Sequence, residues 1–105
     1  MRRLVLTAQA VDDLADIHDA IATASAHTEI ADHFIDEIEA RCLDIARLSS
    51  RLGRPRPEFG HDLRSLPHGN YLIFLRYRDR DTVEVVTVIH ASRDLDAFFD
   101  DRSGA

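Results

Sequence analysis

The sequence predicts an α+β fold in two layers, with an N-terminal helical hairpin packed on one face of a small, mostly antiparallel sheet. Three observations support this prediction. Apolar residues recur at helical spacing between residues 11 and 46, two strand-like runs cover residues 71–77 and 83–89, and a loop rich in Pro and Gly separates the two halves. A chain of 105 residues is long enough to bury one core, so we expect a single domain over residues 1–105.

The chain begins with a short predicted strand at residues 4–6. Thr7 follows it, and its hydroxyl is suited to cap a helix because it can accept a hydrogen bond from a free backbone N–H group. The next apolar residues recur every three or four positions, with aspartates between them, which indicates an amphipathic helix with an acidic face. These apolar residues are Val11, Leu14, Ile17, Ile21 and Ala24.

A second helix is predicted after a brief break at residues 26–28. Its apolar stripe is again at helical spacing, and it contains the only cysteine, Cys42. Because the connection is so short, the two helices should lie antiparallel. The stripe consists of Ala31, Phe34, Ile35, Ile38, Cys42, Ile45 and Ala46.

The second half of the chain should supply most of the sheet. Residues 49–62 read as a loop, residues 63–65 as a short strand and residues 67–70 as a turn. Residues 71–77 are apolar at successive positions, as a central strand requires, and residues 83–89 are rich in β-branched side chains. Asp94 can cap a last short helix, and residues 99–105 read as a frayed tail. The element order is therefore β-α-α-β-β-β(-α), and the sheet face away from the hairpin is either exposed or used by a partner.

The composition excludes several classes of protein. A single cysteine cannot form an internal disulfide, and no apolar run approaches the ~20 residues of a spanning helix, so we expect a cytoplasmic protein with no membrane contact. The formal net charge of −6 argues against general coating of nucleic acid. All 13 basic residues are Arg, and seven of them lie in residues 51–80 beside only three acidic residues. The charge is thus split, with a basic centre between two acidic flanks.

The sequence offers no convincing catalytic or metal-binding motif. None of the six histidines forms a His-x-x-x-His pair, so we expect no metal and no cofactor. His90, Ser92 and Asp94 are close in sequence, but their spacing does not place an imidazole between a nucleophile and a carboxylate. Cys42 lies on an apolar stripe, which favours a buried structural thiol. Arginines suit bidentate contact with carboxylate or phosphate, so the basic centre could meet an acidic partner or an RNA backbone, or pair with the chain's own aspartates.

Several segments resemble the ParE toxins of bacterial toxin–antitoxin modules. They are Gly53-Arg54-Pro55-Arg56-Pro57-Glu58, the run from Leu63 to Phe74, and Val88-Ile89-His90-Ala91-Ser92-Arg93-Asp94. Upstream, Ala10-x-x-Asp13-Leu14-x-x-Ile17 and Ala31-x-x-Phe34-Ile35 are also similar to that family. The resemblance covers nearly the whole chain, and the family fold has the element order derived above.

This resemblance implies a toxin that inhibits DNA gyrase by protein–protein binding, with no catalytic residues. It implies neutralisation by a ParD-like antitoxin, which lays a helix and an extended segment across the toxin in a hetero-oligomer. DNA would be contacted only indirectly, through the antitoxin. We expect an acidic, apolar antitoxin segment to pair with the Arg-rich residues 51–80.

The wider RelE/ParE superfamily also contains RelE-like ribosome-dependent mRNA endonucleases, and these supply the main alternative. Arg93 matches one arginine of those nucleases. However, Asn70-Tyr71 replaces another arginine, Phe99 stands where the nucleases have a tyrosine, and the lysines are absent. A third possibility is an inactive homologue that only binds antitoxin.

We therefore predict a partner-facing surface formed by the sheet and the C-terminal helix. For its strand residues, and for Phe74 above all, core packing is the alternative interpretation. The candidate residues are Arg64, Tyr71, Phe74, Arg76, Arg93, Phe98 and Phe99.

Overall fold

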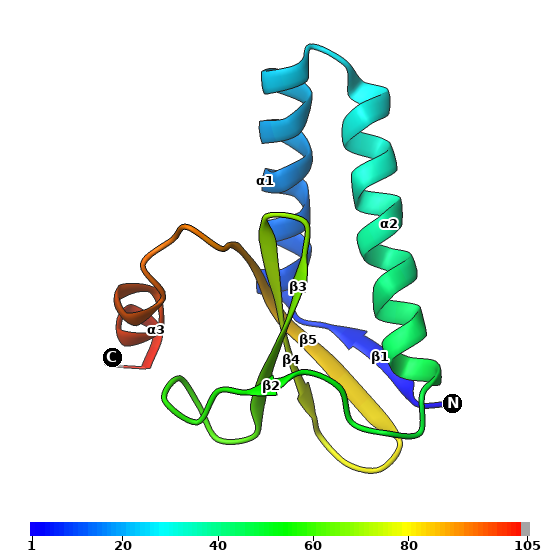
Figure 1. Ribbon diagram of the computed structural model, residues 1–105, viewed down its shortest axis with the longest axis vertical. Coiled ribbons are helices and arrows are strands. Elements are labelled where there is room, and N and C mark those ends of the chain that lie inside the picture. Colours follow the sequence, from blue (N-terminus) through cyan, green and yellow to red (C-terminus); the bar gives the residue numbers. More distant parts are fainter. Residues whose placement is uncertain (104–105) are drawn as a thin grey trace.

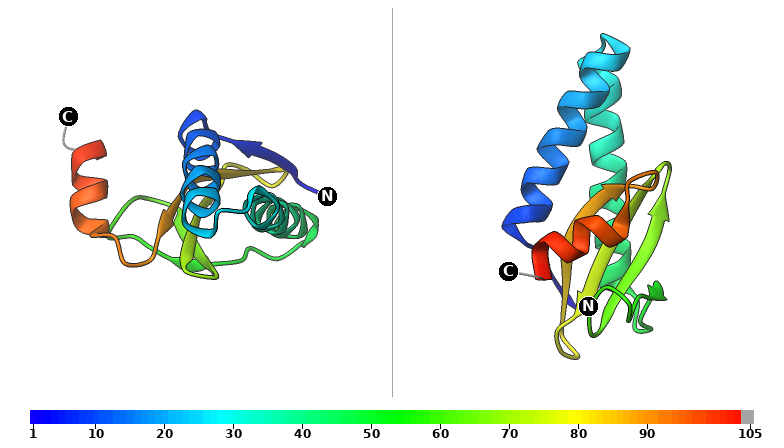
Figure 2. Two further views of the ribbon diagram at one scale, coloured as in Figure 1. Left: turned by 90° about the horizontal axis from the view of Figure 1, so that it is seen from above. Right: turned by 90° about the vertical axis from the view of Figure 1, so that its left-hand side faces the viewer.

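In the computed structural model, two antiparallel helices stand on a five-stranded sheet, and a third short helix lies apart from them (Figures 1 and 2). The structure describes residues 1–103, with side chains for residues 1–100. In chain order the elements are β1 (Arg3–Leu6), α1 (Ala8–Ser25), α2 (Thr28–Arg47), β2 (Arg54–Pro55), β3 (Leu63–His68), β4 (Tyr71–Tyr77), β5 (Thr82–His90) and α3 (Leu95–Ser103).

The sheet has the order β1-β5-β4-β3-β2. The β1 strand pairs in parallel with β5, and every other pairing is antiparallel, so the predicted mostly antiparallel sheet is confirmed. The run at residues 71–77 forms the central strand, as its continuous apolar character predicted. A register shift between Phe74 and Leu75 marks a bulge in the β4–β5 pairing.

The helical hairpin forms where the sequence patterns predicted it. The Thr7 hydroxyl accepts a hydrogen bond from the Ala10 N–H at 3.0 Å, which caps α1. Ala26 takes a left-handed conformation with φ 61°, which ends α1 and allows α2 to turn back. Most of the two apolar stripes then packs on the inner face of the sheet, but Val11 and Ala24 of the predicted first stripe are exposed and Ala10 is buried instead. This core contains Ala10, Ile17, Ile38, Cys42, Ile73, Val85 and Val88.

The face of the sheet away from the hairpin is partly covered by the chain itself. Phe99 of α3 packs there with three buried residues of the sheet, Leu63, Phe74 and Ile89. In the left view of Figure 2, α3 lies to one side of the helical hairpin, and its Phe99 belongs to a separate, smaller core. The sequence left this face exposed or assigned to a partner, and α3 occupies part of it.

Three element boundaries differ from the sequence-based expectations. The predicted loop at residues 49–62 contains the two-residue strand β2, and β3 runs on through Pro67 and His68. The turn is therefore shorter than predicted, and Gly69 with φ +57° provides it. The tail predicted from residue 99 is wrong as far as Ser103, because α3 continues to that residue. Residues 104–105 lie outside the described residues.

Candidate partner-binding surfaces

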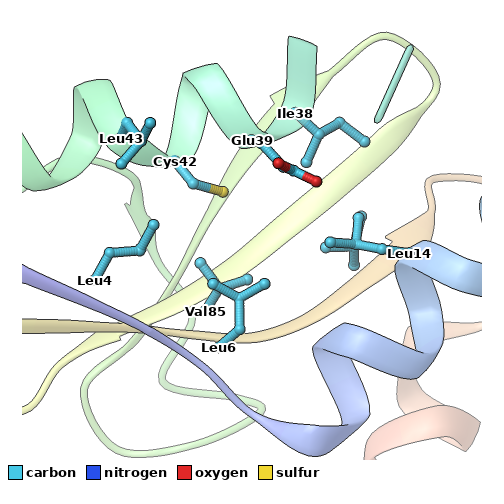
Figure 3. A pocket seen from close by; sticks show the side chains of 9 residues that line it. Leu4, Leu6, Leu14, Ile38, Glu39, Cys42, Leu43 and Val85 are labelled. Carbon is cyan, nitrogen blue, oxygen red and sulfur yellow. The ribbon is translucent and has the colours of Figure 1, made fainter. Parts of the chain in front are cut away.

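An apolar pocket opens between α2 and the edge strand β1, with a volume of ≈ 340 Å³. Figure 3 shows the side chains around it, with Leu4 and Leu6 from β1, Leu14 from α1, Cys42 and Leu43 from α2, and Val85 from β5. Leu43 stands at its rim with 39% of its surface exposed. An apolar concavity of this kind takes an apolar group from a ligand or partner.

The strand beside this pocket has an open edge within the described chain, because β1 is the last strand of the sheet. The amides of Arg3 and Thr7 donate hydrogen bonds toward β5, to the carbonyl oxygens of Asp81 at 2.6 Å and Val85 at 3.1 Å. Since backbone groups alternate in direction along a strand, those of Leu4 and Leu6 face the open side. The pocket and an edge that can accept another strand are therefore neighbours.

Cys42 contributes a neutral thiol to the wall of the pocket. Its side chain is buried, and burial, reinforced by the charge of Glu39, raises the pKa of this thiol to about 11. The sequence-based interpretation of a buried structural cysteine is confirmed. The thiol thus behaves as a small apolar group at neutral pH.

The seven residues predicted to form one surface are spread over both faces of the sheet and α3. Phe74 has no exposed surface and Phe99 only 9%, because the two rings pack together with centroids 5.0 Å apart. Phe59 stacks on Phe99 at 4.7 Å, and half-buried Phe98 meets Phe99 at 5.2 Å. Phe74 and Phe99 are therefore buried in this structure, where they hold α3 on the sheet, and their contact with a partner stays a prediction.

Arg64 and Arg76 lie on opposite faces of the sheet. Arg64 is half-buried, and it donates a hydrogen bond to the carbonyl oxygen of Gly53 at 3.0 Å. The Arg76 guanidinium lies 3.7 Å from the carboxylate of Glu84 on the neighbouring strand. Both arginines are thus engaged within the chain and lie on different faces of the sheet, and their contact with a partner stays a prediction.

Tyr71 and Arg93 lie near a third region, beside α1. The Tyr71 ring packs against His90 with centroids 5.1 Å apart, and the Arg93 guanidinium stacks on Phe98 at 4.9 Å. Both residues line a shallow groove together with Asp13 and Asp16 of α1. The groove therefore carries the positive charge of Arg93 and the negative charges of the two aspartates.

The sequence analysis missed the pocket beside β1. Leu43 was the one indication of it in the sequence, because it is a large apolar residue outside the buried stripe of its helix.

No group of His, Cys, Asp and Glu suited to a metal ion occurs among the described residues. Within the described part of the chain, no helix has the length and apolar character that crossing a membrane requires.

The fold has a counterpart among solved structures. A solved structure titled "Chromosomal ParDE TA system from P. aeruginosa" superposes with a TM-score of 0.76 at 18% sequence identity, covering 88% of this chain and 98% of that one. The family model described as "ParE toxin of type II toxin-antitoxin system, parDE" matches residues 4–95. The chain therefore belongs to the ParE toxin family. Among curated proteins, none matches it.

Proposed function

We propose that this protein is a toxin that binds a ParD-like antitoxin and inhibits DNA gyrase by protein–protein contact. The observation that carries the antitoxin part is the apolar pocket beside the open edge of β1. An extended segment can add to a sheet edge through its backbone while an apolar side chain enters an adjacent pocket. The one site thus offers both affinity and selectivity for a peptide partner.

The gyrase part rests on membership of the ParE toxin family, which generally acts by binding proteins. The chemistry of the Arg93 region favours binding over RNA cleavage, because Asp13 and Asp16 line the same groove and would repel a phosphate. Phe99 offers no hydroxyl for proton transfer, and it is buried. Contact with DNA would then be indirect, through the antitoxin, and the protein would act in the cytoplasm.

A growth experiment tests this function. The gene is expressed from an inducible promoter, alone and together with the neighbouring reading frame. We expect growth arrest with the toxin alone and recovery with the neighbour, and we expect the two proteins to purify as one hetero-oligomer. Normal growth combined with stable complex formation would instead identify a homologue that only binds antitoxin.

A further inference from the structure

Four arginines gather in a second pocket, at the end of the molecule where α2 ends and β1 begins. We propose that this pocket, lined by Arg2, Arg47, Arg51 and Arg80, receives carboxylates from an acidic segment of the antitoxin. The pocket has a volume of ≈ 450 Å³. This inference rests on the proposed antitoxin partner, and it identifies the part of the toxin that would favour an antitoxin with an acidic segment.

Most other arginines of residues 51–80 are already engaged within the chain. Arg56 donates a hydrogen bond to the Ser65 hydroxyl at 2.8 Å and lies 3.7 Å from Glu58. Arg78 lies 3.6 Å from Glu84, which also faces Arg76, and Arg64 is held by a backbone carbonyl. A partner would have to displace these contacts before using the same charges.

Of the four arginines that line the pocket, Arg2 is held by backbone carbonyl oxygens, whereas Arg47, Arg51 and Arg80 are less engaged. Among the side chains that the structure describes, no carboxylate forms an ion pair with Arg2, Arg51 or Arg80. Arg47 lies 3.8 Å from Asp44, with both side chains more than 60% exposed, so this pair is weak. The one acidic residue that lines the pocket is Asp81. The pocket therefore presents three available guanidinium groups, those of Arg47, Arg51 and Arg80, against one carboxylate.

Arg2 holds together the backbone segments that line this pocket. Its guanidinium donates hydrogen bonds to the carbonyl oxygens of Leu48 at 2.6 Å, Ser49 at 2.9 Å and Arg80 at 3.2 Å. The positive charge of Arg2 beside the C-terminal end of α2 offsets the negative end of the helix dipole, which would otherwise repel an anion. The hydrogen bonds also tie the segment after α2 to the β4–β5 turn. The guanidiniums of Arg2 and Arg51 both lie over the Tyr77 ring, at 4.7 and 5.4 Å from its centroid.

Two features favour an acidic peptide over nucleic acid as the occupant. The chain carries a net charge of −6, and the exposed face of α1 is acidic, so a long polyanion would be repelled by most of the surface. A short peptide meets only the basic end. The second feature is continuity, because Arg2 immediately precedes β1, whose open edge adjoins the apolar pocket. A segment paired with β1 would pass directly onto the arginines.

The test measures binding of a short fluorescent oligo-glutamate peptide to the full chain by fluorescence anisotropy at low salt. We expect the double variant Arg51→Ala/Arg80→Ala to weaken binding by about tenfold, since exposed charge pairs each contribute up to ~1 kcal/mol. Arg51→Lys/Arg80→Lys should restore most of the binding. Arg54→Ala is the matched control, because Arg54 is an exposed arginine of the same segment outside this pocket, and it should change little.

Three outcomes would overturn the inference. The first is no binding of the oligo-glutamate peptide, and the second is an equal loss with Arg54→Ala. The third is tighter binding of a short DNA duplex of similar charge through the same two arginines, which would make the site a phosphate site. The peptide assay needs no antitoxin, so its failure is distinguishable from failure of the growth experiment.

Discussion

The hydroxyl of Thr87 on β5 donates a hydrogen bond to the carboxylate of Asp13 on α1, although the two residues are 74 positions apart. The same carboxylate oxygen accepts the Val88 N–H at 3.0 Å, and Gln9 donates to the other oxygen at 2.7 Å. Thr87 is completely buried beside a bulge in the β4–β5 pairing. Asp13 therefore supplies acceptors for polar groups inside the core and fixes α1 against the sheet.

Replacement of Asp13 by alanine should destabilise the fold. Asp13→Ala leaves the buried Thr87 hydroxyl and the Val88 N–H without their acceptor, and such losses cost about 1–3 kcal/mol. Chemical denaturation of both proteins measures the difference in the free energy of unfolding. Asp12→Ala is the control, because Asp12 is the exposed neighbour on the same helix, and an equal effect there would remove the special role of Asp13.

Truncation of Phe99 should release α3 from the sheet while the hairpin core stays folded. The ring contacts both Phe59 and Phe74, and α3 contributes few other buried groups. We expect Phe99→Ala to accelerate amide hydrogen exchange in α3 well above any change in β4. Phe98→Ala should have a smaller effect, since Phe98 remains half-buried. Unchanged protection of α3 in Phe99→Ala would contradict this account.

The Cys42 thiol should make stability fall at alkaline pH. Its pKa in the folded state, raised by burial from 9.0 to about 11, keeps it protonated while the unfolded chain loses the proton. The stabilisation is complete below pH 9 and is lost as the pH rises toward 11, by up to about 3 kcal/mol. Thermal unfolding of the wild type and Cys42→Ala measures this. The stability difference between them should shift in favour of Cys42→Ala across this range, and a constant difference would exclude the coupling.

A charge at the rim of the apolar pocket should block the antitoxin without unfolding the toxin. Leu43→Glu places a carboxylate where an apolar side chain of the partner would enter, so we expect at least tenfold weaker binding. The matched control is Ile30→Glu, on the same helix and 51% exposed but outside the pocket. Titration of each toxin with the product of the neighbouring gene decides the matter, and equal affinities for the two variants would reject the pocket as the docking site.

Local patterns in the sequence predicted most of the architecture. The Thr7 cap, the second apolar stripe, the first stripe apart from Val11 and Ala24, and the central strand at residues 71–77 are confirmed. Each of them depends on a short-range rule of periodicity or capping. The position of α3 was not predicted, because its attachment depends on Phe59 and Phe74, which are distant in sequence. Asp94 was correctly predicted to cap it, since its carboxylate accepts the Ala97 N–H at 3.1 Å.

The candidate site was harder to predict for the same reason. Arg64 and Arg76 stood out in the basic segment, but the partners that engage them, Gly53 and Glu84, come from other parts of the chain. The apolar pocket depends on β1 pairing beside β5, which places Leu4 and Leu6 against α2. Neither arrangement follows from a local pattern. It stays a prediction that a partner contacts the candidate residues, which are Arg64, Tyr71, Phe74, Arg76, Arg93, Phe98 and Phe99.

The most direct test of the central claim is a gyrase supercoiling assay with purified toxin. We expect the toxin to inhibit supercoiling of relaxed plasmid in a dose-dependent manner, and we expect the antitoxin to relieve the inhibition. The toxin should leave ribosome-bound mRNA intact under the same conditions. Full supercoiling activity at a large excess of toxin, together with cleavage of ribosome-bound mRNA, would contradict the account and identify a nuclease.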